Sequence, residues 1–437
     1  MFEKNMHNPW LKEVVDEEAI SELREVEFAP TYNTRCVLCK GTKLLCGKLR
    51  CPVLVRAYVH LKTKTFIDSL SLEGASPPAV FVGRIGYPYV AIGPLIPPLH
   101  DDTSLLDTPE FWTGKSIDEI VEFRAKLVRG KYRINVTGAS KITDGIRELA
   151  LSRGPTEVKA LFTKKPAGRL VLDENAPPFG PSAPLKKIEL SELKIDPRLD
   201  KAYTDTDLKA AEAVIELYRA GALVSKIQRA FSVGALGLEK KRKFVPTRWS
   251  ITAVDSIISK ELIEKVKYYH LISDYEVYEA EQNDRKFIVL LIPREWSYEL
   301  IEAWYPGTVW NPTGARAVIY SSFEPYEGRT KYAEIGGCYY AARLACTEFL
   351  TSIGKQASAI VFSEAYPGYI MPLGVWHVRE NVRLALREKS NKFDSLEQAL
   401  NYISTKLRAP ILRWLRNSNL LKSLLYQKRI EDYLKEK

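Results

Sequence analysis

The sequence predicts a mixed α+β fold, in which a mixed-sheet body is surrounded by helices, with a cysteine-rich knuckle near the N-terminus and a helical C-terminal tail. Between 76 and 98, short apolar runs are broken by glycine or proline, which is typical of strands joined by tight turns. The apolar run 287–293 ends at a proline and predicts a buried strand. Helical periodicity is found over 117–127, 144–152, 205–220, 223–231, 336–350, 396–407 and 411–426.

Length, net charge and the distribution of apolar residues limit the kinds of protein that this chain can be. The chain has 437 residues, more than one hydrophobic core usually organises, so we expect two domains or one large domain with appendages. Its 64 basic and 54 acidic side chains give a net charge of +10, which favours anionic partners. Neither a signal peptide nor an apolar run of membrane-spanning length is present, so we expect a soluble, cytoplasmic protein without membrane contact.

Composition also changes along the chain and predicts five segments. They are an acidic arm or helix (1–30), a basic four-cysteine element (31–65), a central α+β body with a proline-rich loop at 164–187 (66–310), a C-terminal α+β part (311–410), and a basic helix with a short tail (411–437).

The N-terminal cysteines have the spacing of a metal site. Cys36, Cys39, Cys46 and Cys51 lie within sixteen residues, and a Cys-x2-Cys pair can hold one ion. Four sulfur ligands would close the coordination sphere, so we expect one structural zinc in a zinc-finger-like element rather than a catalytic metal. Four thiolates can also bind an iron-sulfur cluster, and the spacing leaves that alternative open. The other two cysteines, Cys338 and Cys346, are expected to be buried.

Three further groups of side chains suit a phosphate backbone. The cysteine element carries cations without an acidic residue, which favours nucleic-acid contact by Arg35, Lys40, Lys43, Lys48 and Arg50. Arg84 stands between two glycines, where its guanidinium and nearby backbone amides could hold an anion, although the P-loop pattern is missing. Cations followed by aromatics predict a charged groove with stacking surfaces at Lys240, Lys241, Arg242, Lys243, Arg248 and Trp249.

A histidine next to a tryptophan marks another candidate site. His377 and Arg379 would suit phosphate recognition or acid-base chemistry, because histidine titrates nearest to neutral pH. If they met Arg84 and Arg248 in one cleft, the protein could be an enzyme acting on a nucleotide or a nucleic-acid phosphodiester. No cluster of carboxylates at metal-binding spacing supports a two-metal nuclease, so whether the protein is an enzyme stays open.

The last residues contain a short docking pattern. Gln427, Ile430, Tyr433 and Leu434 form the frame Gln-x-x-aliphatic-x-x-aromatic-hydrophobic. One short helical turn would place the three apolar side chains on one side as a plug, with the glutamine reaching a separate polar pocket. This frame resembles the motif with which replication and repair proteins bind the sliding clamp PCNA.

Taken together, the cysteine element, the passage from Ser76 to Pro98, the stretch 245–250 and the tail resemble the archaeal Nre family over nearly the whole chain. The resemblance implies a DNA repair factor that binds zinc and DNA, acts on damage such as crosslinks, and is recruited by PCNA, with other repair proteins as further candidate partners. This tail departs from the pattern by ending in Tyr433-Leu434 instead of two aromatics. The resemblance assigns no catalytic residue, and a zinc-bearing RNA-binding or ribosome-associated factor remains a second alternative.

Overall fold

The computed structural model describes residues 32–40, 43, 45, 69–167 and 172–426. This part of the chain divides into two compact units. The N-terminal unit contains the described residues from Ser69 to Glu261 and a returning segment, Met371–Glu380. The C-terminal unit contains Leu262–Ile370, the described residues from Asn381 onward, and helix α3 (Tyr32–Cys39). No helix in the described ranges is long and apolar enough to cross a membrane.

The sheet of the N-terminal unit has the strand order β1-β5-β6-β4-β3-β2 among the described residues. Neighbouring strands are antiparallel except for the pair β4 and β6. The predicted strands between 76 and 98 are confirmed as β2 and β3, joined by a tight hairpin. The strands are β1 (Ser71–Ser76), β2 (Val80–Val82), β3 (Tyr89–Ile96), β4 (Val128–Asn135), β5 (Thr156–Phe162) and β6 (Ser182–Leu190).

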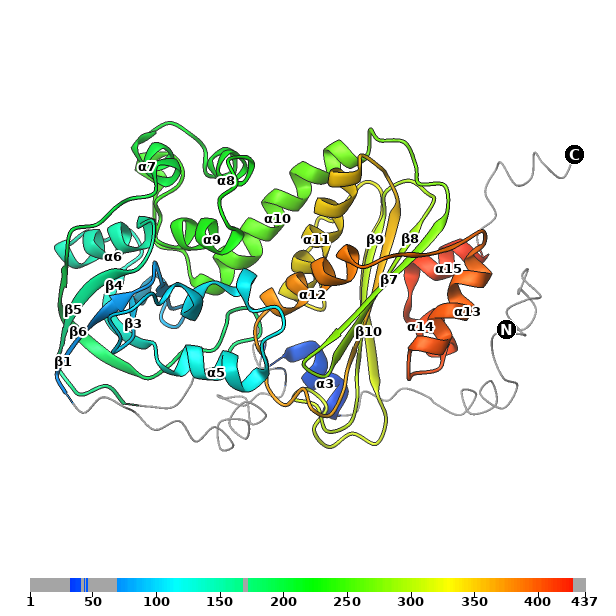
Figure 1. Cartoon of the computed structure of the whole chain (residues 1–437), viewed down its shortest axis with the longest axis horizontal. Coiled ribbons are helices and arrows are strands. Elements are labelled where there is room, and N and C mark those ends of the chain that lie inside the picture. Colours follow the sequence, from blue (N-terminus) through cyan, green and yellow to red (C-terminus); the bar gives the residue numbers. More distant parts are fainter. Residues whose placement is uncertain (1–31, 41–42, 44, 46–68, 168–171, 427–437) are drawn as a thin grey trace, which may run out of the picture. The chain divides into compact units, whose positions relative to one another are not determined.

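Helices and short 3-10 turns accompany this sheet (Figure 1). They are η2 (Ser104–Asp107), η3 (Pro109–Phe111), α5 (Ile117–Ala125), α6 (Lys141–Leu151), α7 (Pro197–Thr204), α8 (Ala210–Arg219), α9 (Val224–Ser232), η4 (Glu239–Lys241) and α10 (Thr247–Val266), the last of which continues into the C-terminal unit. The predicted helix 117–127 is confirmed as α5, and Ser116 and Glu119 form a reciprocal capping box at its start. The predicted helix 205–220 begins later, since Asp205 ends α7.

The second sheet lies in the C-terminal unit and has the order β10-β9-β11-β8-β7-β12 among the described residues. Only the pair β9 and β11 is parallel. The predicted strand 287–293 is confirmed within β8. The strands are β7 (Tyr275–Gln282), β8 (Arg285–Ile292), β9 (Tyr298–Trp304), β10 (Val318–Glu324), β11 (Ser358–Ala365) and β12 (Asn391–Phe393).

Helices cover both faces of this second sheet (Figure 1). Helix α11 (Gly337–Ile353) lies on one face, and α13 (Leu396–Lys406), α14 (Ile411–Asn417) and α15 (Asn419–Tyr426) lie on the other. Every residue of β9 and β11 is buried as a result. A further helix, α12 (Trp376–Arg387), begins in the N-terminal unit and ends in the C-terminal unit.

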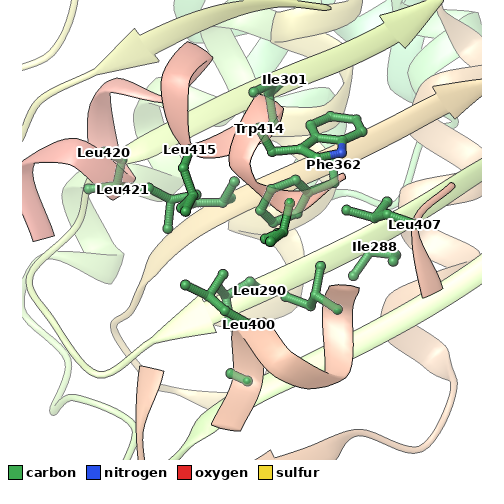
Figure 2. Packing of buried hydrophobic residues seen from close by; sticks show 14 of the residues in the cluster. Ile288, Leu290, Ile301, Phe362, Leu400, Leu407, Trp414, Leu415, Leu420 and Leu421 are labelled. Atoms are coloured by element: carbon green, nitrogen blue, oxygen red, sulfur yellow. The ribbon is translucent and has the colours of Figure 1, made fainter. Parts of the chain in front are cut away.

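The apolar core under α13 to α15 is continuous from strand to helix (Figure 2). Ile288 and Leu290 of β8, Ile301 of β9 and Phe362 of β11 face these helices. The ring of Trp414 meets Phe362 edge-on at a centroid distance of 5.4 Å. The helices add Leu400, Leu407, Leu415, Leu420 and Leu421. Because such side chains each bury apolar surface worth about 1.5–3 kcal/mol, this layer accounts for much of the attachment of the C-terminal helices.

The predicted helix 411–426 is two helices, which meet at an extended Ser418. The reason is a buried carboxylate on the sheet. Glu299 of β9 accepts hydrogen bonds from the backbone N–H groups of Asn419 (2.9 Å) and Leu420 (3.0 Å) and from the Ser418 hydroxyl. The N-terminus of α15 thereby gains the acceptor that its first N–H groups lack, and a single longer helix would have no group free to bind Glu299.

A second buried carboxylate on β9 holds α3. The side chain of Lys40, the residue after α3, forms an ion pair with Glu302 at 2.6 Å, and Arg285 binds the same carboxylate at 2.8 Å. Burial by itself would raise the pKa of Glu302, but the two cations outweigh burial and lower this pKa to about 2. Lys40 has a backbone φ of 44°, so the chain leaves the helix in a left-handed conformation as the side chain enters the core.

Acid unfolding tests this ion pair. The fall in the Glu302 pKa from 4.5 to about 2 corresponds to about 3 kcal/mol of unfolding free energy. A lowered carboxyl pKa stabilises the folded state above the unfolded value, and this stabilisation is lost as the pH falls from 4.5 toward 2. We expect Glu302→Gln to have a shallower pH dependence than the native chain in that window, measured by urea unfolding at a series of pH values.

The matched control is Glu388→Gln, which changes an exposed glutamate of the same unit and should keep the native pH dependence. If the unfolding free energy of Glu302→Gln depends on pH as that of the native chain does, then the pKa of Glu302 is not lowered by its two ion pairs.

Candidate nucleic-acid interface

The tip of the β2–β3 hairpin is a compact double turn. The backbone N–H of Tyr87 donates to the carbonyl of Arg84 at 3.3 Å, and the N–H of Tyr89 donates to that of Gly86 at 2.8 Å. Gly86 has a φ of 84°, which the third position of a type II turn requires and which glycine adopts without strain. Ile85 therefore occupies the second position of the first turn and points away from the sheet.

Three contacts hold this hairpin against the rest of the N-terminal unit. The N–H of Val82 donates to the Thr247 hydroxyl at 2.8 Å, at the start of α10. The N–H of Val136, just after β4, donates to the carbonyl of Pro88 at 2.9 Å. The ring of Tyr87 lies 5.3 Å from that of Trp249, centroid to centroid. The tip is thus fixed from the sheet side and from the helix side.

Large apolar side chains remain exposed around this tip. Ile85 is 87% exposed, Tyr89 54%, Trp249 46% and Tyr87 43%. Single exposed apolar residues are common in proteins, but four within one hairpin and the adjoining helix turn form a group. The three aromatic rings offer stacking faces of the kind that unpaired bases use.

Cations surround the exposed rings. The segments that build this surface, 80–96, 128–135 and 240–250, contain nine lysines and arginines and no acidic residue. Arg129 is buried, and the exposed cations are Arg84, Arg133, Lys240, Lys241 and Lys243. Arg84 and Arg133 are exposed, and neither makes an ion pair with another described residue. The guanidinium of Arg133 reaches Gly86, because its Nη2 lies 3.6 Å from where a β-carbon on that glycine would stand. We call Arg84, Ile85, Tyr87, Tyr89, Arg133 and Trp249 the hairpin surface.

The residue after the basic stretch 240–243 is linked to the hairpin by two backbone hydrogen bonds. The N–H of Phe244 donates to the carbonyl of Val136 at 2.8 Å, and Val136 also binds the hairpin at Pro88. Lys240, Lys241 and Lys243 are exposed. Arg242 is instead committed to the fold, since its guanidinium donates to backbone carbonyls of Tyr203, Asp205 and Gly237.

Arg248 is not available to an external anion either. Its Nη2 lies 2.5 Å from the carboxylate of Glu174, and the amide of Asn175, oriented with its oxygen toward Arg248, accepts at 2.8 and 2.9 Å. The same loop binds the chain before α12, because the carbonyl of Asn175 accepts from the N–H of Val375 at 3.1 Å. Arg248 therefore fixes a loop while its neighbour Trp249 faces outward.

His377 and Arg379 are interior residues, 0% and 1% exposed. Arg379 donates to both oxygens of Asp255, at 2.9 and 3.1 Å, and to Glu380 at 3.2 Å. Arg84, by contrast, is exposed on the hairpin. The four side chains of the enzyme hypothesis thus do not share one open cleft, and the hypothesis gains no support from the geometry. The buried arginine and its carboxylates instead join α10 to α12 within the N-terminal unit.

The cysteine element is described only in part. Cys36 and Cys39 lie three residues apart in the last turn of α3. Within the described ranges no group of three or more potential metal ligands is found. Cys46, Cys51, Lys48, Arg50 and the side chain of Arg35 lie outside those ranges. Lys40 is buried in its ion pair, so it cannot meet a phosphate as expected, whereas Lys43 is exposed. Cys338 and Cys346 are buried, as predicted.

The four tail residues, Gln427, Ile430, Tyr433 and Leu434, also lie outside the described residues, and so does the predicted acidic arm or helix at 1–30. The last described helix, α15, ends at Tyr426, immediately before the tail frame begins.

Four members of the hairpin surface were not singled out from the sequence: Ile85, Tyr87, Tyr89 and Arg133. A usable signal was present, because three separate segments without acidic residues are each strand-like or rich in aromatics. What the sequence could not provide is the pairing of β3 with β4, which sets Tyr89 opposite Asn135 and Ala91 opposite Arg133 on one face.

Comparison with known proteins places the chain in a family. The model of the N-terminal part of archaeal Nre proteins matches residues 45–311, and the model of the C-terminal part matches residues 324–433. The DNA repair protein NreB of Archaeoglobus fulgidus is 42% identical over 388 residues, which cover 89% of this chain and 97% of that protein. The DNA repair protein NreA of the same organism is 38% identical, covering 86% and 94%. The DNA repair protein NreA of Haloferax volcanii is 36% identical, covering 84% and 91%. This chain therefore belongs to the archaeal Nre family.

Proposed function

We propose that this chain is a DNA repair factor that binds DNA with accessible bases through the hairpin surface. Its Nre relatives carry the name DNA repair protein, which supports the general role. The observation that carries the DNA contact is the combination of exposed rings with exposed cations on the hairpin surface: Tyr87, Tyr89 and Trp249 beside Arg84 and Arg133.

The chemistry of this surface favours unpaired nucleotides. Stacking of a base on an aromatic side chain contributes about 1–3 kcal/mol and needs a base face that is not already stacked in a duplex. Lysine and arginine bind the phosphates and release condensed counterions, so affinity should fall with rising salt. RNA presents the same phosphates and base faces, and the RNA alternative is therefore separated from DNA by direct comparison.

Substitution of Trp249 and Arg84 tests the DNA contact by fluorescence anisotropy with a labelled single strand. We expect Trp249→Ala to weaken binding about tenfold, as the loss of one stacked base would. Arg84→Ala should weaken binding and make the slope of log affinity against log salt shallower by about 0.7, the value for one phosphate contact on a single strand.

Controls of the same chemistry exist elsewhere in the chain. Tyr268 is 89% exposed and Lys194 is exposed, both away from the hairpin in sequence, so Tyr268→Ala and Lys194→Ala should bind like the native chain. Native binding by Trp249→Ala, or equal losses in all four variants, would remove the hairpin surface from the proposal. A matched RNA strand bound more tightly than DNA would favour the RNA-binding alternative.

We further propose that the tail recruits the protein to PCNA. Tyr433 and Leu434 with Ile430 supply the apolar plug, and Gln427 supplies the polar contact. Removal of residues 427–437 deletes none of the described fold, whose last packed core residue is Leu425. We expect this truncation to abolish capture by immobilised PCNA in a pull-down while thermal unfolding stays native. Tyr433→Ala should do the same and Glu431→Ala should not; capture of the truncated chain would disprove the tail assignment.

We also propose one structural zinc at Cys36, Cys39, Cys46 and Cys51. The two described cysteines fit a metal site, because positions three apart on a helix lie on the same side. Elemental analysis of the purified protein should find about one zinc per chain, the amount one four-thiolate site binds. Cys36→Ser should lower this content and Cys346→Ala should not. Iron in place of zinc would indicate the iron-sulfur alternative, and neither metal would disprove the site.

A further inference from the structure

We propose that Ile85 is a wedge that inserts between bases where a DNA duplex is already weakened, so that the hairpin selects DNA containing an unpaired or mismatched stretch over fully paired DNA. This inference rests on the proposed function of the hairpin surface and adds the substrate class. Its basis is the juxtaposition of an outward isoleucine, a fixed turn and flanking cations.

The position of Ile85 is unusual for an isoleucine. Second positions of tight turns favour proline or polar residues, whereas β-branched residues favour strands. Ile85 nevertheless stands there with 87% of its surface exposed, so it contributes little to the core. An apolar, β-branched side chain has few rotamers, and it can enter a base stack without losing much conformational freedom.

A wedge also needs a support that does not yield. The hairpin carrying Ile85 is bound at Val82 by Thr247 and at Pro88 by Val136. The ring of Tyr87 contacts Trp249, two residues after Thr247 in the first turn of α10. A force on the tip would thus be transmitted to α10, a helix of 20 residues, and to β4, the strand that precedes Val136.

The surroundings of Ile85 match what an opened duplex presents. Arg84 precedes it and the Arg133 guanidinium lies beside Gly86, so cations flank the wedge where two phosphate backbones would pass. Tyr87, Tyr89 and Trp249 supply faces for a displaced base. Apolar wedges that enter base steps unstack them, and this is easiest where pairing is already interrupted. Mismatches, bubbles and forks are therefore the expected substrates.

The test compares the native chain with Ile85→Ser and Ile85→Leu on short labelled duplexes, one fully paired and one with a central mismatched bubble. We expect the native chain to prefer the bubble about tenfold, Ile85→Leu to retain this preference, and Ile85→Ser to lose most of it, since a small polar side chain cannot replace a stacked base. Because Ile85 is almost fully exposed, both variants should fold normally.

A 2-aminopurine base placed at the edge of the bubble reports insertion directly, because its fluorescence rises when it is unstacked. The native chain and Ile85→Leu should raise this signal and Ile85→Ser should not. Ile370→Ser is the matched control, since it replaces another isoleucine that is 52% exposed and lies two residues after a turn, and it should behave like the native chain.

The outcomes separate the wedge from the proposed function. If Ile85→Ser keeps the native bubble preference and 2-aminopurine signal while Trp249→Ala loses single-strand binding, the wedge is wrong and the DNA contact stands. If the native chain binds none of the DNA or RNA probes, both proposals are wrong and the exposed hairpin is better explained as a protein-binding surface.

Discussion

The burial of charge on strand β9 constrains much of the C-terminal unit. Glu299 and Glu302 are three residues apart on a strand with both faces covered, so their carboxylates point to opposite sides of the sheet. A buried carboxylate is tolerated only when it is paired or hydrogen-bonded. On one side Lys40 and Arg285 meet that requirement, and on the other side the N-terminus of α15 does. The sheet therefore determines both where α3 ends and where the last described helix begins.

The N-terminal unit uses its charges in two different ways. Some cations form ion pairs within the unit: Arg379 binds Asp255, and Arg248 binds Glu174 in a loop. Others, such as Arg84 on the β2–β3 hairpin and Arg133 on β4, are exposed and have no ion-pair partner among the described residues. Removing a buried partner leaves an uncompensated charge in the core, whereas changing an exposed cation alters mainly the field outside. Stability and the proposed DNA contact thus depend on separate side chains and can change independently.

Short sequence patterns predicted the structural features that depend only on neighbouring residues. The Ser116 cap, the buried strand within 287–293 and the hairpin between 76 and 98 follow from short-range chemistry, and all three are present. The division of 411–426 at Ser418 depends on Glu299, 119 residues away, which no periodicity reveals. Lys40 and Arg379 were expected to meet anions from outside, since a sequence does not show which cation will face a buried carboxylate. Ile85 did not stand out in the sequence, because its proposed role depends on the turn that exposes it and on the neighbours that β4 and α10 bring.

The returning segment Met371–Glu380 limits how recombination could divide the gene for this protein. The chain crosses from the N-terminal to the C-terminal unit within α10, returns before α12, and crosses again within that helix. Neither unit is one continuous stretch of sequence, so no single exchange of genetic material can deliver one of them intact to another protein. A recombination point in the gap between the two family matches, after 311 and before 324, would separate β7, β8 and β9 from β10 and β11 of the same sheet. A chain that carried only one of the two matched regions would therefore lack strands of the C-terminal sheet.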